Sequence, residues 1–109
     1  MVNSRAKGAR YERQVELWLS AQFGDRITRV NRSGFDGEDF DLDGLVSIEV
    51  KNHAKLELSS WLAQADRDAG PDRLPIVLHK KRGSSTVGDD YVTMYARDLA
   101  ALLMLERQR

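Results

Sequence analysis

The fold is decided by residues 45–51, which have the sequence Leu-Val-Ser-Ile-Glu-Val-Lys. In this stretch Val46, Ile48 and Val50 alternate with a serine and two charged residues. A period of two is typical of a β-strand that has one face against the core and one polar face. The stretch therefore predicts a strand whose polar face carries an acid and a base, Glu49 and Lys51, about 6.5–7 Å apart.

A second short strand is predicted just upstream, at residues 40–43, and Asp43-Gly44 is a common turn sequence between paired strands. The resulting hairpin would bring an acidic side chain of the first strand close to Glu49. Asp41 could reach this point. Asp39 and Asp43 have the same strand parity as Asp41, so periodicity alone does not choose among the three.

The rest of the chain predicts three helices and three further strands. The helices are expected at about 8–22, 58–69 and 98–107, and the strands at 27–30, 74–79 and 91–95. Ser59 or Ser60 is the expected N-cap of the middle helix. The order α-β-β-β-α-β-β-α predicts an α/β fold, with a mixed central sheet flanked by helices.

Length and composition limit the possible classes of protein. A chain of 109 residues fits a single domain, residues 1–109. The absence of cysteine excludes disulfides, thiolate zinc sites and cysteine nucleophiles. No apolar run approaches the ~18 residues that span a membrane, so we expect no membrane contact and a cytoplasmic location.

The net charge is zero, which argues mildly against a dedicated nucleic-acid binder, but the charges are grouped. An acidic block occupies residues 36–43, and basic residues cluster at 5–13, 26–32 and 80–82. Basic patches around an acidic centre suit a metal site that cleaves phosphodiesters. On the charge pattern alone, however, a solvated, salt-bridged surface is the more usual explanation.

The acidic residues suggest one chemistry. Asp41 and Glu49 could bind Mg²⁺, which prefers carboxylate oxygens and water, and Mn²⁺ should substitute for it. The ion would polarise a phosphate oxygen and activate a water molecule, while Lys51 stabilises the developing charge. Glu12, in the first helix, could add a third carboxylate. The alternative for Glu49 and Lys51 is an exposed ion pair, which such a tripeptide usually forms.

Over nearly its full length the chain resembles the PD-(D/E)xK, or restriction-endonuclease-like, nucleases. It is most similar to the Holliday junction resolvases of archaea and of bacteriophages that infect actinobacteria. Five segments carry the resemblance, and they are residues 7–13, 41–45, 47–52, 58–65 and 75–81.

The resemblance implies particular roles for residues of this chain. It places catalytic residues at Glu12, Asp41, Glu49, Lys51 and Gln64, with Glu12, Asp41 and Glu49 as metal ligands. It favours Asp41 over Asp39 and Asp43, because an apolar residue and a turn glycine follow it. One departure is Phe40, which stands where the family has proline.

The resemblance also implies the substrate and partners. The expected activity is hydrolysis of branched DNA, most simply a four-way junction in DNA recombination, by a homodimer with two active sites. The expected DNA contacts are Arg5, Lys7, Arg10, Arg32, Ser33, Lys80 and Lys81. The leucine-rich closing helix or the exposed side of the sheet could form the dimer interface, and the alternative for the leucines is ordinary core packing. A nuclease for other DNA forms, an inactive DNA-binding module and a protein-interaction module remain alternatives.

Overall fold

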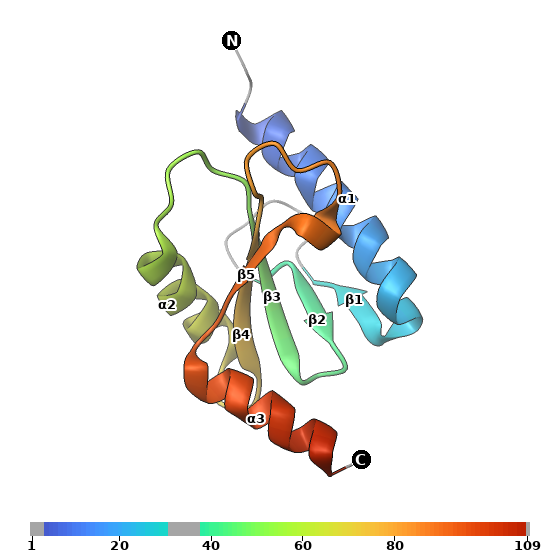
Figure 1. The fold of residues 1–109 in the computed structure, drawn as a ribbon, viewed down its shortest axis with the longest axis vertical. Coiled ribbons are helices and arrows are strands. Elements are labelled where there is room, and N and C mark those ends of the chain that lie inside the picture. Colours follow the sequence, from blue (N-terminus) through green and yellow to red (C-terminus); the bar gives the residue numbers. More distant parts are fainter. Residues whose placement is uncertain (1–3, 31–37, 109) are drawn as a thin grey trace.

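The computed structural model describes residues 4–30 and 38–108, in which three α-helices surround a five-stranded sheet (Figure 1). The helices are α1 (Ser4–Phe23), α2 (Leu58–Ala69) and α3 (Ala96–Arg107). The strands are β1 (Ile27–Arg29), β2 (Phe40–Leu42), β3 (Val46–Lys51), β4 (Leu74–His79) and β5 (Tyr91–Thr93). Single 3₁₀ turns at Gly24–Arg26 and Val87–Asp89 complete the order. The α/β fold and the predicted order of helices and strands are confirmed.

The sheet is mixed, and its strands follow the chain order from β1 to β5. β1, β2 and β3 form an antiparallel meander, whereas β3 and β4 are parallel, and β5 returns antiparallel to β4. The parallel pair follows from α2, because two parallel neighbours need a crossover between them. This arrangement is that of a restriction-endonuclease-like fold.

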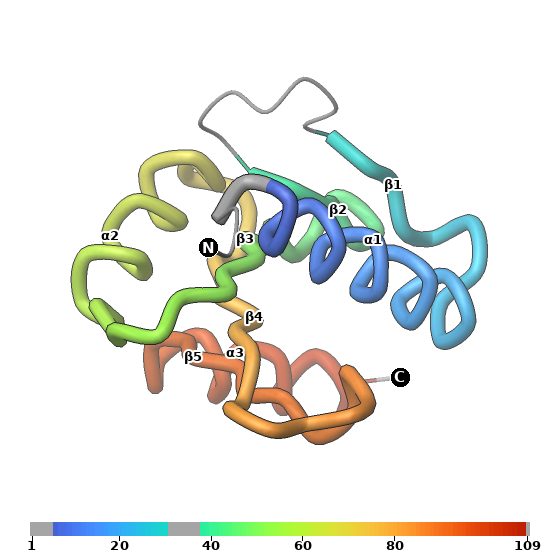
Figure 2. Tube along the Cα trace, turned by 90° about the horizontal axis from the view of Figure 1, so that it is seen from above, coloured from blue at the N-terminus to red at the C-terminus, as the bar shows by residue number. Residues whose placement is uncertain are grey.

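Two helices cover opposite faces of the sheet, as seen from above in Figure 2. On one face Tyr11, Val15 and Leu19 of α1 form a buried cluster with apolar residues of β2, β3 and β4. On the other face Trp61 and Ala65 of α2 pack with Val77 of β4. The apolar side of β3 faces α1, so its polar side, with Glu49, faces α2.

The turn of the β2–β3 hairpin is the predicted one. Asp43 and Gly44 have φ angles of 58° and 67°, in the left-handed region that only glycine and short polar residues adopt readily. The turn pairs Leu42 with Val46. It therefore sets which residues of β2 and β3 lie opposite each other.

Several boundaries differ from the sequence prediction. α1 begins at Ser4 rather than near residue 8, because the basic N-terminal segment continues the helix. The N-cap of α2 is Glu57 and not a serine; the Ser60 hydroxyl donates to the Glu57 carbonyl 3.2 Å away. α3 begins at Ala96, and β1, β2 and β5 are one or two residues shorter than predicted.

The closing helix packs less than a core helix would. Leu102 packs against the α1 cluster, whereas Leu99, Leu103 and Leu105 are 44–58% exposed. Core packing therefore accounts for only one of the four leucines. No helix in the described part of the chain combines the length and the apolar character required to span a bilayer.

Candidate active site

Two buried carboxylates lie together where β2 begins and β3 ends. Asp39 precedes β2 and is 8% exposed, and Glu49 in β3 is 6% exposed. The Asp39 N–H donates to the Ile48 carbonyl at 2.9 Å, and the Asp39 carboxylate accepts from the Val50 N–H at 2.7 Å. Because Asp39 bonds to both neighbours of Glu49, the hairpin holds the two acids side by side.

The electrostatics of this pair are unfavourable without a cation. Burial raises the pKa of Asp39 to about 7, and the nearby Glu12 carboxylate adds to the rise. Burial also raises the pKa of Glu49 to about 8, and repulsion from Asp39 adds to it. Glu49 Oε2 is buried and has no hydrogen-bond partner in the described structure. An acceptor in this state is suited to bind a cation or to carry a proton.

Lys51 supplies a positive charge beside the pair. Its ammonium lies 3.5 Å from Glu49 Oε1, and its side chain is only 18% exposed. The alternative of an ordinary exposed ion pair therefore does not describe Glu49 and Lys51, because both side chains are largely buried. The geometry leaves one Glu49 oxygen near the ammonium and the other unpaired.

Glu12 approaches the pair from α1. It is bound by Arg29 of β1 at 2.9 Å, and burial raises its pKa. Its electrostatic effect on Asp39 places it close to the site, but Arg29 already neutralises much of its charge. Glu12 and Lys51 both line a pocket of about 330 Å³ between α1 and the end of β3.

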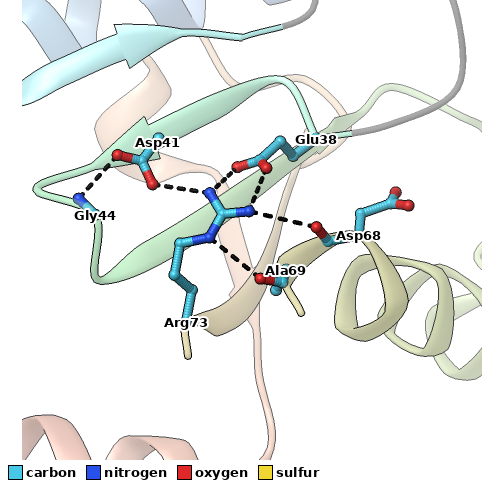
Figure 3. A network of polar contacts seen from close by, with 6 residues as sticks. All are labelled: Glu38, Asp41, Gly44, Asp68, Ala69 and Arg73. Carbon is cyan, nitrogen blue, oxygen red and sulfur yellow. Dashed lines mark hydrogen bonds and ion pairs between the residues drawn. The ribbon is translucent and has the colours of Figure 1, made fainter. Parts of the chain in front are cut away.

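Asp41 has different neighbours from those expected. Its Oδ1 accepts from Arg73 at 2.9 Å, and its Oδ2 accepts from the Gly44 N–H at 2.8 Å (Figure 3). The same guanidinium holds both oxygens of Glu38 and reaches the carbonyls of Asp68 and Ala69. In the register of the hairpin Asp41 lies opposite Ser47, one alternate position away from Glu49. The geometry therefore favours Asp39, an alternative that periodicity left open, over Asp41.

Asp43, the third candidate, lies in the turn. It forms an ion pair with Arg26, and both side chains are substantially exposed. Arginine thus binds Glu38, Asp41 and Asp43, while Asp39 is left facing Glu49. The three aspartates have the same parity in the strand pattern. What distinguishes Asp39 from Asp41 and Asp43 is the set of side chains that each one contacts.

One further acidic residue of α2, Asp68, acts on the site, and the predicted residue Gln64 lies one turn before it in the same helix. Gln64 is half-buried, as is Asp68 one turn later. Asp68 raises the pKa of Glu49 through its charge, and its Oδ2 is buried without a hydrogen-bond partner in the described residues. Sequence reasoning missed Asp68, although its spacing of four from Gln64 places both on one helical face.

The predicted DNA contacts fall into three groups. Lys7 lines the pocket that contains Glu12 and Lys51, and Lys80 and Lys81 follow β4. Arg10 is exposed on α1. Arg32, Ser33 and the side chain of Arg5 lie outside the described residues.

The side chains at the site could supply some, but not all, of the ligands of a hard divalent cation. Within residues 4–30 and 38–108, no group of three or more acidic, histidine or cysteine side chains is arranged to hold a metal ion. The protein could therefore supply two carboxylates, from Asp39 and Glu49. Mg²⁺ is commonly held by one or two carboxylates with water and substrate phosphate as the other ligands. The buried, unpartnered Glu49 oxygen is consistent with this arrangement.

Comparison with known proteins gives one result. The family model described as "Phage putative PDDEXK endonuclease" matches residues 3–108, which is almost the whole chain. No curated protein and no solved structure matches the chain significantly.

Proposed function

The chain belongs to this phage PDDEXK endonuclease family, and on that premise we propose that it is a divalent-metal-dependent endonuclease that hydrolyses phosphodiester bonds in branched DNA. The observation that carries the proposal is the buried pair of Asp39 and Glu49 beside a single ammonium group. Two carboxylates so placed are costly unless a cation or a proton is shared between them.

We assign the metal ligands to Asp39 and Glu49. Bound there, Mg²⁺ or Mn²⁺ would activate a water molecule and polarise the scissile phosphate. Asp39 is fixed for this role by its bond to the Val50 N–H, and Glu49 by its position in the central strand. Rigid placement matters, because catalytic groups must be held near the productive geometry before substrate arrives.

Lys51 would act on the substrate. Its ammonium is anchored beside Glu49 and lies at the wall of the pocket, so it can donate to a phosphate oxygen as negative charge develops. Glu12 shares that pocket and would accept from a water molecule while Arg29 holds its orientation. Gln64 would border the site from α2.

Branched DNA and a homodimer are the finer parts of the proposal. Symmetric cleavage of a junction needs two active sites related by a two-fold axis. The exposed leucines of α3 offer a surface for such a dimer, because a short helix with few core contacts is marginal in water. We expect the enzyme to act in the cytoplasm of the host cell, where phage DNA is replicated and recombined.

The decisive experiment is cleavage of a synthetic four-way junction and of a linear duplex of the same sequence, each with and without Mg²⁺. We expect the junction to be cut only with the metal and faster than the duplex. Glu49→Gln and Lys51→Ala should abolish cleavage and retain junction binding. Glu57→Gln is the matched control, because Glu57 is an exposed glutamate at the start of α2.

Other outcomes have defined meanings. Equal rates of junction and duplex cleavage would indicate a nuclease for other DNA forms and not a junction resolvase. Binding without cleavage under any divalent metal would indicate an inactive DNA-binding module. Cleavage by Glu49→Gln at the wild-type rate would refute the assignment of the site. Sedimentation of the wild type and of Leu103→Glu would test whether α3 forms the dimer interface.

A further inference from the structure

A second groove adjoins the candidate active site and has a different chemical character. It has a volume of about 620 Å³ and shares Lys7, Asn52, His53 and Ala54 with the pocket that contains Glu12 and Lys51. The two hollows therefore form one continuous path. A linear polymer bound in the groove would lead into the pocket.

The charge of the groove is positive. Its described lining includes Lys7, Lys80, Lys81 and Arg82 and contains no acidic residue. This is a local property, because the whole chain has no net charge. A row of basic side chains that ends at a phosphodiester-cleaving site is complementary to a nucleic-acid backbone.

The loop that carries these charges is fixed in place. Asp90 accepts from the Lys81 N–H at 2.9 Å, from the Ser84 hydroxyl, and from the Tyr11 hydroxyl of α1 at 2.7 Å. Although burial alone would raise it, these hydrogen bonds lower the pKa of Asp90, which keeps the carboxylate ionised. In Figure 1 the loop between β4 and β5 accordingly lies beside the N-terminal part of α1.

The internal bonds also divide the basic residues by role. The Lys80 ammonium donates to the carbonyl and hydroxyl of Ser84, both at 3.0 Å, so it holds the loop. Lys81 and Arg82 are exposed and form no ion pair within the described part of the chain. Their side chains are therefore available to a ligand in the groove, whereas that of Lys80 is engaged within the loop.

The other wall of the groove is apolar and aromatic. Tyr91 of β5 is 50% exposed and Leu56 is 55% exposed, and both line it. The Tyr91 ring is backed by His79 at a centroid distance of 5.7 Å, which limits its movement. An exposed ring beside phosphate-binding cations is the arrangement that binds unpaired bases, because the faces of paired bases are hidden in a duplex.

We propose that this groove binds an unpaired DNA strand, with Lys81 and Arg82 on its phosphates and Tyr91 stacked on a base, and leads it to the site. The inference rests on the proposed function in assuming that the polymer is DNA. It adds that the substrate has unpaired nucleotides next to the cleaved bond. A branch point with a single-stranded arm then binds better than a fully paired junction.

The test is binding of fluorescent oligo(dT) and of a duplex of equal length to the full chain, measured by anisotropy in EDTA. Tyr91→Leu should weaken oligo(dT) binding about 5- to 100-fold and leave duplex binding unchanged, whereas Tyr91→Phe should bind as wild type. Lys81→Ala and Arg82→Ala should each lower the salt dependence of oligo(dT) binding by about 0.7 in the logarithmic slope. Arg67→Ala, exposed on α2, is the control for charge.

Two results would overturn the inference. One is an equal effect of Tyr91→Leu on oligo(dT) and duplex, which would assign the groove to duplex or to another partner. The other is an unchanged salt slope in both basic variants. Because binding is measured without metal, the result is independent of cleavage. If Tyr91→Leu selectively weakens oligo(dT) binding but the wild type has no nuclease activity, only the proposed function is refuted. If the wild type cleaves DNA but Tyr91→Leu does not selectively weaken oligo(dT) binding, only the proposed role of the groove is refuted.

Discussion

Two pairs of carboxylates in the same hairpin region have opposite surroundings, and the pair without an arginine is also the more buried one. The side chains of Glu38 and Glu49 are 11% and 7% exposed. Glu38, together with Asp41, surrounds the guanidinium of Arg73 (Figure 3). Among the described residues, Glu49, which faces Asp39, has the Lys51 ammonium beside one oxygen and no hydrogen-bond partner at the other.

The difference separates a structural role from a chemical one. A carboxylate whose two oxygens both accept hydrogen bonds, with an arginine among the donors, is already neutralised and gains little from a metal ion. A buried pair of carboxylates that repel each other stores an unfavourable interaction, which a divalent cation would relieve. In this hairpin both the burial of the carboxylates and the positions of the arginines favour Asp39 and Glu49 as the proposed metal ligands.

The largest expected effect comes from exchanging one aspartate in each pair. Asp39→Asn should lower metal-dependent cleavage at least about 100-fold, because it removes a proposed ligand and leaves the fold intact. Asp41→Asn should lower it by no more than about threefold, since the amide can still accept from the Gly44 N–H. Cleavage rates at saturating Mg²⁺, with circular dichroism to confirm folding, provide the comparison. The reverse ranking would restore Asp41 as the ligand.

The next effect concerns the guanidinium itself. Arg73→Met leaves two largely buried carboxylates unpaired, so the free energy of unfolding should fall by about 2 kcal/mol, less than for a fully buried pair because Arg73 is 22% exposed. Urea denaturation measures this. Arg26→Met, which breaks the exposed pair with Asp43, should have a clearly smaller effect. Equal losses in the two variants would contradict the contrast between a buried and a surface network.

The sequence predicted the hairpin but not the choice of its carboxylate, and the reason is physical. Alternation along β3 identifies the face of Glu49 and Lys51, and the turn at Asp43-Gly44 defines the hairpin. Asp39, Asp41 and Asp43 occupy equivalent positions in that alternation. Asp41 differs from Asp39 through its contact with Arg73, which lies 32 residues beyond Asp41 in the chain. No local sequence pattern indicates such a contact.

One sequence signal could have favoured Asp39. A turn that pairs Leu42 with Val46 gives partners whose numbers sum to 88, so Asp41 falls opposite Ser47 and Asp39 falls near Glu49. The exposure of the α3 leucines had no comparable signal, because it depends on what the helix packs against and helical periodicity does not reveal the partner.

The pH dependence of stability tests the unpaired carboxylates directly. In the folded protein the pKa values of Asp39 and Glu49 are raised to about 7 and about 8. A raised pKa of an acid means that the folded state retains protons that the unfolded state has released. The contribution of these two groups to the stability of the metal-free protein is therefore fully present below about pH 4 and is lost as the pH rises through 7 and 8.

This loss should appear as a melting temperature in EDTA that falls by about 5–10 °C between pH 5 and pH 9. Mg²⁺ should raise the melting temperature more at pH 9 than at pH 6, since bound metal replaces the protons. The double variant Asp39→Asn, Glu49→Gln should lose most of both effects. A melting temperature that rises with pH in EDTA would show that ionisation of Asp39 and Glu49 does not destabilise the folded protein.

The smallest effect is expected at Asp43, and its smallness is informative. The Arg26–Asp43 pair is exposed at 54% and 38%, so water already screens it. Asparagine tolerates the positive φ of 58° at this position nearly as well as aspartate does. Asp43→Asn should therefore leave the cleavage rate and the melting temperature close to wild type, whereas Asp43→Val should destabilise the turn through backbone strain. If Asp43→Asn instead reduced cleavage as strongly as Asp39→Asn, an exposed aspartate in the turn would be part of the chemistry, and the buried pair of Asp39 and Glu49 would no longer account for the activity by itself.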